Sequence, residues 1–325
     1  MRFPTLLLAL LAFAFAVNAR ITASEPLALP PTVASAKRIV FLGDSITYSG
    51  AYVDFIETVL RTRVPAWRGE ILDLGLSSET VSGLSEAGHA GGKFPRPDLH
   101  ERLARILAQT KPDLVLACYG MNDGIYFPFS EDRFAQFRQG MARLHEAVIA
   151  AHAAIIHVTP PIFDAQPIAA KTLPAGLDAY PQPFAGYNGV LDRYSAWLLS
   201  QRTHGWEVID AHGPMAATLA HLRQTDPVFT FSKDGVHPDT LGHAVIARAI
   251  LTAWGLRPDD GELLGQLVTN PDAERLKLIR ARRKLLSHAW LTATGHQRPG
   301  VTPGLPLPEA NAQAAAIEEK IRALK

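Results

Sequence analysis

A serine, an aspartate and a histidine stand in segments that could together activate a hydroxyl group. Ser45 ends the stretch "RIVFLGDS", and Asp234 and His237 belong to the later stretch "KDGVH". A serine hydroxyl becomes a nucleophile at neutral pH when a neighbouring base accepts its proton. His237 offers that base through one ring nitrogen, and Asp234, one turn upstream, can fix the other nitrogen and stabilise the imidazolium. These residue types predict acyl transfer at Ser45.

Attack of a serine on an acyl carbon also needs hydrogen-bond donors for the oxyanion that forms. The candidate donors are the backbone N–H groups of Ser45 and Gly75, in "LDLGLSS", and the side-chain amide of Asn122, in "YGMND". A helix starting at Ser45 would add positive potential at the same place. His89 and Tyr126 follow the same two segments and are candidate substrate contacts, with an ordinary loop role as the alternative.

Two other interpretations of these residues stay open at this point. Ser45 or Thr47 could simply cap the helix that follows the first apolar run. Carboxylate and imidazole groups suit several divalent ions, so a metal site is conceivable from Asp210, His212, Asp234 and His237. Such a site would leave Ser45 and Asn122 without a purpose, and we therefore predict neither a metal nor any other cofactor.

The elements that position these residues alternate between apolar runs and helical patterns. Five segments have the continuous apolar character of strands buried on both faces, namely "RIVFLGD", "EILDLGL", "DLVLACYG", "AAIIHVTP" and "WEVIDAH". Between them, apolar residues recur three and four positions apart, as in Val53, Ile56 and Leu60; Leu99, Leu103 and Ile106; Phe134, Phe137 and Met141; and Leu191, Tyr194 and Leu198. This alternation predicts a parallel sheet with helices on both faces. Its strands end at one edge, where ligands bind.

The segments that carry the reactive residues resemble the sequence blocks of the SGNH (GDSL-type) hydrolase family, in the same order. The blocks are "FLGDSIT", the glycine of "DLGLSS", "GMND" and "DGVH". The resemblance maps the serine, glycine, asparagine and histidine of the family onto Ser45, Gly75, Asn122 and His237. It implies a flavodoxin-like three-layer α/β/α fold with a five-stranded parallel sheet, and serine esterase chemistry without a metal. Asp73 stands two residues before Gly75, where asparagine is common in the family.

The chain divides into four predicted parts. Arg2 precedes an apolar stretch, and small residues precede a cleavage site after Ala19, so residues 1–19 are interpreted as a signal peptide. An uncleaved membrane anchor is the alternative, for which the apolar run is short. The other predicted parts are a linker, 20–36; the SGNH-type hydrolase domain, 37–255; and a helical C-terminal extension, 256–325, that the family pattern does not explain.

Within the extension, Asn270 is predicted to cap a helix that has Pro271 at its first position. The charged run Arg280–Lys284 is interpreted as a solvated face of that helix. Trp290 could either contact a sugar or anchor the helix on the domain. We expect the proline-rich loop 160–186 and the segment 287–300 to shape substrate choice.

Composition limits the classes of function. The 325 residues carry a net charge of +1, so there is no overall attraction to nucleic acid or to an anionic membrane, and we expect no stable membrane insertion. Cys118 is the only cysteine, which excludes a disulfide or a thiolate zinc site within one chain. We predict a secreted or periplasmic serine esterase acting on a small or polysaccharide ester, first of all a carbohydrate O-acetylesterase. A lysophospholipase or acyl-thioesterase is the alternative of the same class, and a non-catalytic carbohydrate-binding protein on the same fold is the alternative of another class.

Overall fold

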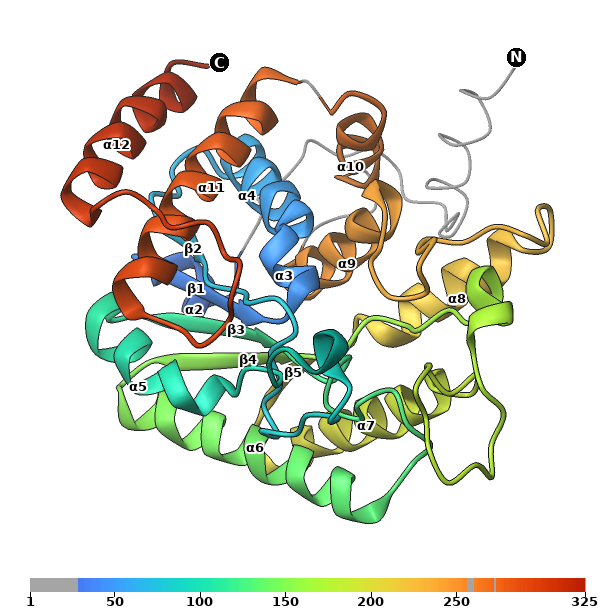
Figure 1. Cartoon of the computed structure of the whole chain (residues 1–325). Helices are drawn as coiled ribbons and strands as arrows, with labels where there is room; N and C mark the ends of the chain where they lie inside the picture. Colours follow the sequence, from blue (N-terminus) through green and yellow to red (C-terminus); the bar gives the residue numbers. More distant parts are fainter. Residues whose placement is uncertain (1–28, 256–259, 272, 325) are drawn as a thin grey trace.

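Five parallel strands form the central sheet of the computed structural model, which describes residues 29–255, 260–271 and 273–324 (Figure 1). The strands are β1 (Arg38–Gly43), β2 (Glu70–Asp73), β3 (Leu114–Cys118), β4 (Ala154–Val158) and β5 (Glu207–Ile209), in the spatial order β2-β1-β3-β4-β5. Each strand lies within one of the five predicted segments and ends before that segment does, where the chain leaves the sheet. The predicted parallel sheet is confirmed.

The strands have continuous apolar sequences because both faces of the sheet are covered. All residues of β3 are buried, and so are all residues of β1 after Arg38. The register places Ile39 opposite Ile71 of β2 on one side and opposite Leu114 of β3 on the other. A strand with two buried faces does not alternate apolar and polar residues, and this makes such strands recognisable in the sequence.

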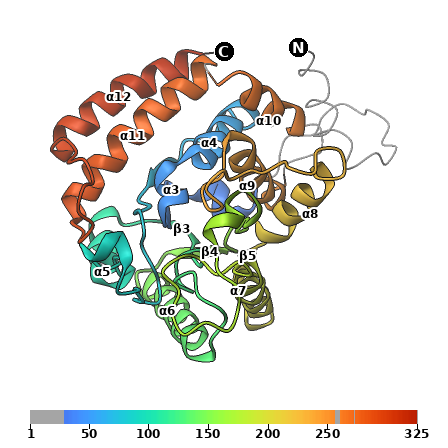
Figure 2. The same cartoon turned by 45° about the vertical axis from the view of Figure 1, so that its right-hand side comes forward.

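Helices cover the two faces of the sheet, as Figures 1 and 2 show. On one face lie α4 (Ala51–Arg63) and α9 (Thr240–Ala253), with α8 (His212–Leu222) beside α9; on the other lie α5 (Leu99–Thr110), α6 (Glu131–Ala150) and α7 (Asn188–Ser200). Their buried sides contain residues that the spacing predicted, such as Val53, Ile56 and Leu60 of α4. The α/β class and the flavodoxin-like three-layer arrangement are confirmed.

The predicted signal peptide, residues 1–19, lies outside the described residues, as does the predicted linker up to residue 28. The remainder of that linker, 29–36, includes a short helix, α2 (Pro31–Ser35), whose Val33 is buried in the core. Across the described ranges, no helix combines the length and the apolar character needed to cross a membrane.

The loop 160–186 lies at the edge of the sheet where the strands end. It is not irregular throughout, because it contains a short 3₁₀ helix, η3 (Gln166–Lys171), and a β-bridge in its second half. The N–H of Asp164 donates to the carbonyl of Gly235 at 2.9 Å, and the N–H of Phe184 donates to the carbonyl of Tyr126 at 2.8 Å. These bonds fix the loop against the segment that precedes α9 and against the segment that follows β3.

The C-terminal extension is helical and packs beside α4 and β2 (Figure 1). It contains α10 (Asp260–Thr269), α11 (Glu274–Thr294) and α12 (Leu307–Ala323). The predicted start of α11 at Pro271, with Asn270 as its cap, is wrong. The N–H of Asn270 donates to the carbonyl of Gln266 at 2.8 Å and so prolongs the last turn of α10, and α11 begins only at Glu274.

The interpretation of the charged run Arg280–Lys284 as a solvated face is wrong for two of its members. Arg282 and Arg283 are each 4% exposed, because α11 lies along α4, which presents Asp54 and Glu57 to it. Arg283 Nε donates to Asp54 Oδ1 at 2.6 Å, and Arg282 pairs with Glu57. Buried ion pairs therefore join the extension to the hydrolase domain.

Trp290 anchors the extension in the core of the protein. Its side chain is 7% exposed, and the guanidinium of Arg38 lies 5.8 Å from its ring centroid. Of the two roles considered for Trp290, the structure therefore favours the anchor. His288, two residues earlier, is partly exposed and stacks on Tyr48, with ring centroids 6.3 Å apart. The extension thus reaches the segment that begins at Ser45.

Candidate active site

Ser45 is the first residue of a short helix, α3 (Ser45–Ser49), that follows β1 after a single residue. That residue, Asp44, caps the helix, because its Oδ1 accepts the N–H of Ile46 at 2.9 Å. The alternative in which Ser45 or Thr47 provides the cap is therefore wrong. Ser45 is partly exposed, so its hydroxyl group is placed at the surface by a buried strand and a capped helix.

A continuous chain of short hydrogen bonds joins the three residues predicted to act together. Ser45 Oγ lies 2.7 Å from His237 Nε2, and His237 Nδ1 lies 2.6 Å from Asp234 Oδ2. The other carboxylate oxygen of Asp234 accepts the backbone N–H groups of Val236 and His237. Partial burial raises the pKa of Asp234, but the hydrogen bonds from His237 and the backbone outweigh it and leave that pKa below its usual value. Asp234 is thus an ionised acceptor for the imidazole ring.

Two further carboxyl groups at the strand ends are buried. Burial raises the pKa of Asp44 to about 7 and the pKa of Asp123 to about 6. Asp123 Oδ1 accepts the N–H groups of Val81 and Ser82 at 2.9 and 2.8 Å. Both carboxyls therefore bond to backbone N–H groups and hold turns, Asp44 at the start of α3 and Asp123 between the loops that follow β2 and β3.

Asn122 is nearly buried, with 3% exposure, and every polar atom of its side chain has a partner. Its Nδ2 donates to the carbonyl of Glu79 at 3.2 Å. Its Oδ1 accepts from Arg96 Nη1 at 3.0 Å and from the Tyr126 hydroxyl at 3.1 Å. The amide group is therefore held in one orientation, with one N–H of Nδ2 left beyond the bond to Glu79.

The two candidate substrate contacts lie in different surroundings. Tyr126 is brought directly to the predicted oxyanion donor, through its bond to Asn122. His89 is partly exposed in a 3₁₀ turn, 3.5 Å from Glu86 Oε1, with its ring 5.4 Å from that of Phe94. Its contacts are with the loop after β2 and not with Asn122.

Gly75 follows β2 and packs directly on the backbone of α3. A Cβ atom at this position would lie 2.3 Å from the Tyr48 nitrogen and 2.7 Å from the Thr47 carbonyl carbon, which no larger residue could tolerate. The N–H of Gly75 donates to Asp73 Oδ1 at 3.0 Å. Close packing therefore requires a glycine here, whereas its N–H, predicted as an oxyanion donor, is directed to Asp73.

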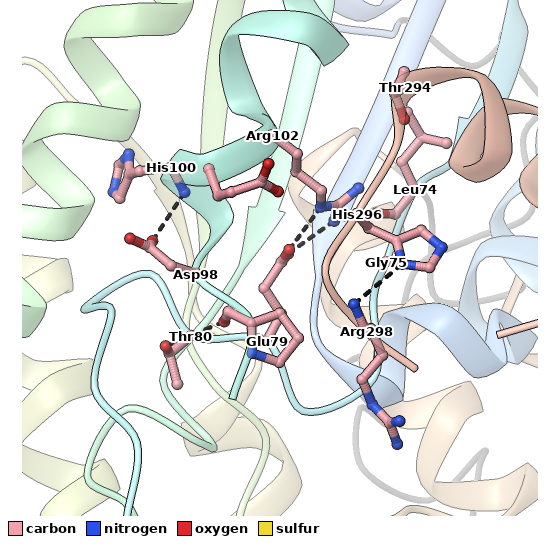
Figure 3. A network of polar contacts seen from close by, with 12 residues as sticks. Leu74, Gly75, Glu79, Thr80, Asp98, His100, Arg102, Thr294, His296 and Arg298 are labelled. Atoms are coloured by element: carbon pink, nitrogen blue, oxygen red, sulfur yellow. Dashed lines mark hydrogen bonds and ion pairs between the residues drawn. The ribbon is translucent and has the colours of Figure 1, made fainter. Parts of the chain in front are cut away.

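A buried ion pair that the sequence analysis missed, between Arg102 and Glu79, lies beside two of the three predicted donors, Gly75 and Asn122; Figure 3 shows the pair with Leu74 and Gly75. Arg102 Nε donates to Glu79 Oε1 at 2.6 Å, and Arg102 Nη2 donates to the carbonyl of Leu74 at 2.7 Å. Leu74 precedes Gly75, and the carbonyl of Glu79 receives the Asn122 amide. The signal for Arg102 was its place on the apolar side of α5, where an arginine needs a buried partner. Arg96 carried no such signal, because it lies in a loop.

The residues considered for a metal site lie in different places. His212 Nε2 pairs with Asp192 Oδ1 at 2.7 Å, whereas Asp234 and His237 lie with Ser45. Within the described ranges, no three His, Cys, Asp or Glu side chains are arranged so that they could hold a metal ion.

Residues 41–245 match the family model of the GDSL-like lipase/acylhydrolases. The matched segment runs from β1 into α9 and contains Ser45, Gly75, Asn122, Asp234 and His237. The chain belongs to this family. It is a carboxylic ester hydrolase of the SGNH (GDSL) type, as its motifs predicted.

Solved structures share the fold of this GDSL-like hydrolase at low sequence identity. A catalytic mutant of Axe2, an acetylxylan esterase from Geobacillus stearothermophilus, is 20% identical with a TM-score of 0.52, over 70% of this chain and 98% of the other. LAE5, an alpha/beta hydrolase from the metagenome of Lake Arreo, Spain, is 23% identical with a TM-score of 0.51, over 69% and 97%. Both are similar in fold. A comparison with curated proteins gave no match.

The extension of this GDSL-like hydrolase supplies a partner for Asp73, the residue that departs from the family pattern. Arg283 Nη1 donates to Asp73 Oδ2 at 3.1 Å, and Arg283 Nη2 donates to the carbonyl of Ser49 at 3.0 Å. Burial raises the pKa of Asp73 to about 6, although the charge of Arg283 acts to lower it. A residue outside the matched segment thus bonds both to the end of α3 and to the carboxylate that holds Gly75.

Proposed function

We propose that this hydrolase is a carbohydrate O-acetylesterase in which Ser45 is the nucleophile, His237 the general base and Asp234 the carboxylate that orients His237. The observation that carries the proposal is the hydrogen-bonded series from Ser45 Oγ through His237 to Asp234, at 2.7 and 2.6 Å. A base within hydrogen-bond reach of the hydroxyl, itself oriented by an ionised carboxylate, is what an activated serine needs.

The proposed reaction has two steps. Ser45 Oγ attacks the acyl carbon while His237 Nε2 takes its proton; the tetrahedral intermediate then collapses, and the alcohol leaves with that proton. A water molecule next gives a proton to His237 and attacks the acyl-serine, which releases the acid and restores the hydroxyl. The second N–H of the Asn122 amide and the backbone N–H of Ser45 stabilise the oxyanion in both steps. Gly75 keeps Ser45 in place because it packs closely on α3. Its N–H bonds to Asp73, and it serves as a third oxyanion donor only in a conformation in which that bond is broken.

The site is open to solvent, and this favours a substrate whose alcohol group is bulky. The side chains of His237 and Asp234 are 51% and 57% exposed, so the reacting groups lie at the surface and not at the end of a tunnel. Axe2, whose fold this chain shares, is an acetylxylan esterase, and this supports an acetylated polysaccharide as the proposed substrate. Export by a signal peptide at residues 1–19 is part of the proposal, because such polymers are found outside the cytoplasm.

The segment 287–300 adds a partly exposed surface beside α3. His288 stacks on Tyr48, which lies on the same side of α3 as Ser45. The guanidinium of Arg298 lies 4.5 Å from the ring centroid of Phe94. Flat rings with polar edges suit a sugar, whose C–H groups pack on the ring while its hydroxyls bond at the edge. We therefore propose that His288 and Arg298 contact the polymer near the scissile ester.

An acyl-length series tests the proposed substrate class. Among p-nitrophenyl esters, kcat/KM is expected to fall about tenfold or more from acetyl to octanoyl, because a site that fits an acetyl group gives a longer acyl chain no apolar surface to bind. Acetate release from an acetylated polysaccharide, followed by chromatography, is expected in the same assays. A preference for long chains would favour a lysophospholipase or acyl-thioesterase, and hydrolysis of neither class of ester would favour a carbohydrate-binding protein.

Replacement of His288 tests the role of the extension in substrate binding. His288→Ala is expected to raise KM for the polymer roughly 2- to 10-fold, because a ring contact of this kind is worth about 1 kcal/mol. Turnover of p-nitrophenyl acetate should not change. Lys284→Ala, an exposed change one turn earlier on α11, is the matched control and should alter neither value. Equal KM values for the polymer in all three proteins would remove His288 from the substrate site.

A further inference from the structure

The orientation of one amide group decides whether Asn122 can act on an oxyanion. An asparagine side chain carries two N–H donors at Nδ2 and a lone-pair acceptor at Oδ1. Turned one way it stabilises a developing negative charge, and turned the other way it repels that charge. Some group outside the amide must therefore fix which end faces Ser45.

Two donors hold the oxygen end of Asn122. Arg96 Nη1 donates to Oδ1 at 3.0 Å, and the Tyr126 hydroxyl donates to the same atom at 3.1 Å. A guanidinium group has donors only, so it can bond to Oδ1 and never to Nδ2. On the other side, Nδ2 donates one N–H to the carbonyl of Glu79 at 3.2 Å, a residue that Arg102 holds in place (Figure 3). These contacts leave the second N–H of Nδ2 for a ligand.

Arg96 is itself rigidly held. Its Nε and Nη2 donate to the two carboxylate oxygens of Glu86, each at 2.7 Å, in a bidentate pair. Its side chain is almost buried, with 8% exposure of the residue, and its guanidinium lies 5.3 Å from the ring centroid of Tyr126. Burial acts to lower the pKa of Arg96, but the hydrogen bonds and charge of Glu86 keep that pKa above its usual value. Arg96 is therefore a fixed cation at the oxygen end of the amide.

The backbone of Tyr126 indicates that its place is maintained at a cost. Its φ angle is +58°, in the left-handed region that a tyrosine rarely adopts. Its ring lies 4.8 Å from that of Tyr187 and 6.0 Å from that of Phe163, and this packing holds the hydroxyl toward Asn122. Burial raises the pKa of the Tyr126 hydroxyl well above its usual value, so the hydroxyl remains a donor at physiological pH.

We propose that Arg96 and Tyr126 are positioning residues for Asn122, and that the positive charge of Arg96 also strengthens the amide as an oxyanion donor. A cation bonded to Oδ1 draws electron density from the amide and makes the N–H groups better donors, as in other hydrogen-bonded series. This proposal rests on the proposed function, because it gives Asn122 a part in stabilising the oxyanion. It extends that function to a series of four residues: Glu86, Arg96, Tyr126 and Asn122.

The test is a pair of double-mutant cycles measured as kcat and KM on p-nitrophenyl acetate. Asn122→Ala alone is expected to lower kcat by about 10²–10³ with little change in KM, because an oxyanion donor acts in the transition state. In the unsubstituted chain, Arg96→Met should lower kcat roughly 10- to 100-fold, and Tyr126→Phe about threefold to tenfold. In the Asn122→Ala background, both changes should lower kcat by less than about twofold, because their target is gone.

The two backgrounds separate positioning from a structural role. Arg96 or Tyr126 changes that lower kcat equally in both backgrounds would overturn the proposal. An Asn122→Ala variant with normal kcat would instead overturn the part of Asn122 in the proposed function. Tyr126→Phe removes only one oxygen atom and keeps the test decisive if Arg96→Met folds poorly. Arg133→Met, which removes a similar arginine stacked on Phe127, is the control and should leave kcat unchanged.

Discussion

Ser45→Ala is expected to remove esterase activity almost entirely while the protein stays folded. Loss of a serine nucleophile typically lowers kcat by about 10⁶-fold, because the remaining groups cannot form the acyl intermediate. The change deletes one hydroxyl group from a partly exposed position, and within the described part of the chain this hydroxyl bonds to His237 alone, so the core is untouched. Turnover of p-nitrophenyl acetate and the thermal unfolding midpoint, measured on the same preparation, check both parts.

Ser49→Ala is the matched control for this experiment. Ser49 lies one turn after Ser45 on α3, and its hydroxyl lies 3.0 Å from His243 Nε2, so it also pairs with a histidine. That variant should keep near-normal turnover. A serine-directed phosphonate should label Ser45 alone, as read from the mass of the modified peptide. Near-normal turnover in Ser45→Ala, or a label on another serine, would mean that another group attacks the ester.

The parallel strands and the place of the site could be predicted from the sequence because both depend on local patterns. Strands buried on both faces appear as apolar runs, and parallel topology then gathers their ends at one edge. Ser45 and Asn122 each come within a few residues of the end of such a run. Asp234 and His237 are only three residues apart, so a short turn suffices to join them. Little long-range information was needed.

The support of the site could not be predicted in the same way, because its pairs join residues far apart in the chain. Arg283 bonds to Asp54, 229 positions away, and a run of basic residues alone gives no sign of such a partner. The orientation of Asn122 depends on Arg96, 26 positions earlier in an irregular loop. The sequence offered Ser45 or Thr47 as the cap of α3 in place of Asp44, because serine, threonine and aspartate all serve as caps and their order does not decide between them.

The buried ion pairs of α11 explain why the extension belongs to the hydrolase domain and is not an appended tail. A buried arginine costs solvation energy that only well-placed carboxylates can offset. Asp54 and Asp73 are 1% and 0% exposed, and burial raises the pKa of both carboxyl groups. Arg283 acts to lower both pKa values, so each would rise further without it. Arg283 of the extension and Asp73, the residue that departs from the family pattern, thus form one contact.

Arg283→Met is therefore expected to lower the free energy of unfolding by about 3–5 kcal/mol, the usual effect of removing one partner from a buried ion pair. Lys284→Met, the next residue of α11 and exposed, should change it by less than about 0.5 kcal/mol. Denaturant unfolding at pH 7 provides the measurement. Equal stability of the two variants would show that Asp54 and Asp73 do not need the arginine.

The deficit of Arg283→Met should also depend on pH, with a sign fixed by the raised pKa values. When the pKa of an aspartate is higher in the folded protein than in the unfolded chain, the protein loses stability as pH rises from the unfolded-state pKa, near 4, to the folded-state pKa. In the unsubstituted chain that loss ends near pH 6 for Asp73, whereas without Arg283 the folded pKa rises further and the loss continues. The deficit should therefore be small at pH 4 and largest at pH 8.

Adding Asp73→Asn to Arg283→Met should restore part of the stability at pH 8, because the amide keeps an acceptor for Gly75 and carries no charge. A deficit that is the same at both pH values would contradict this account of the pair.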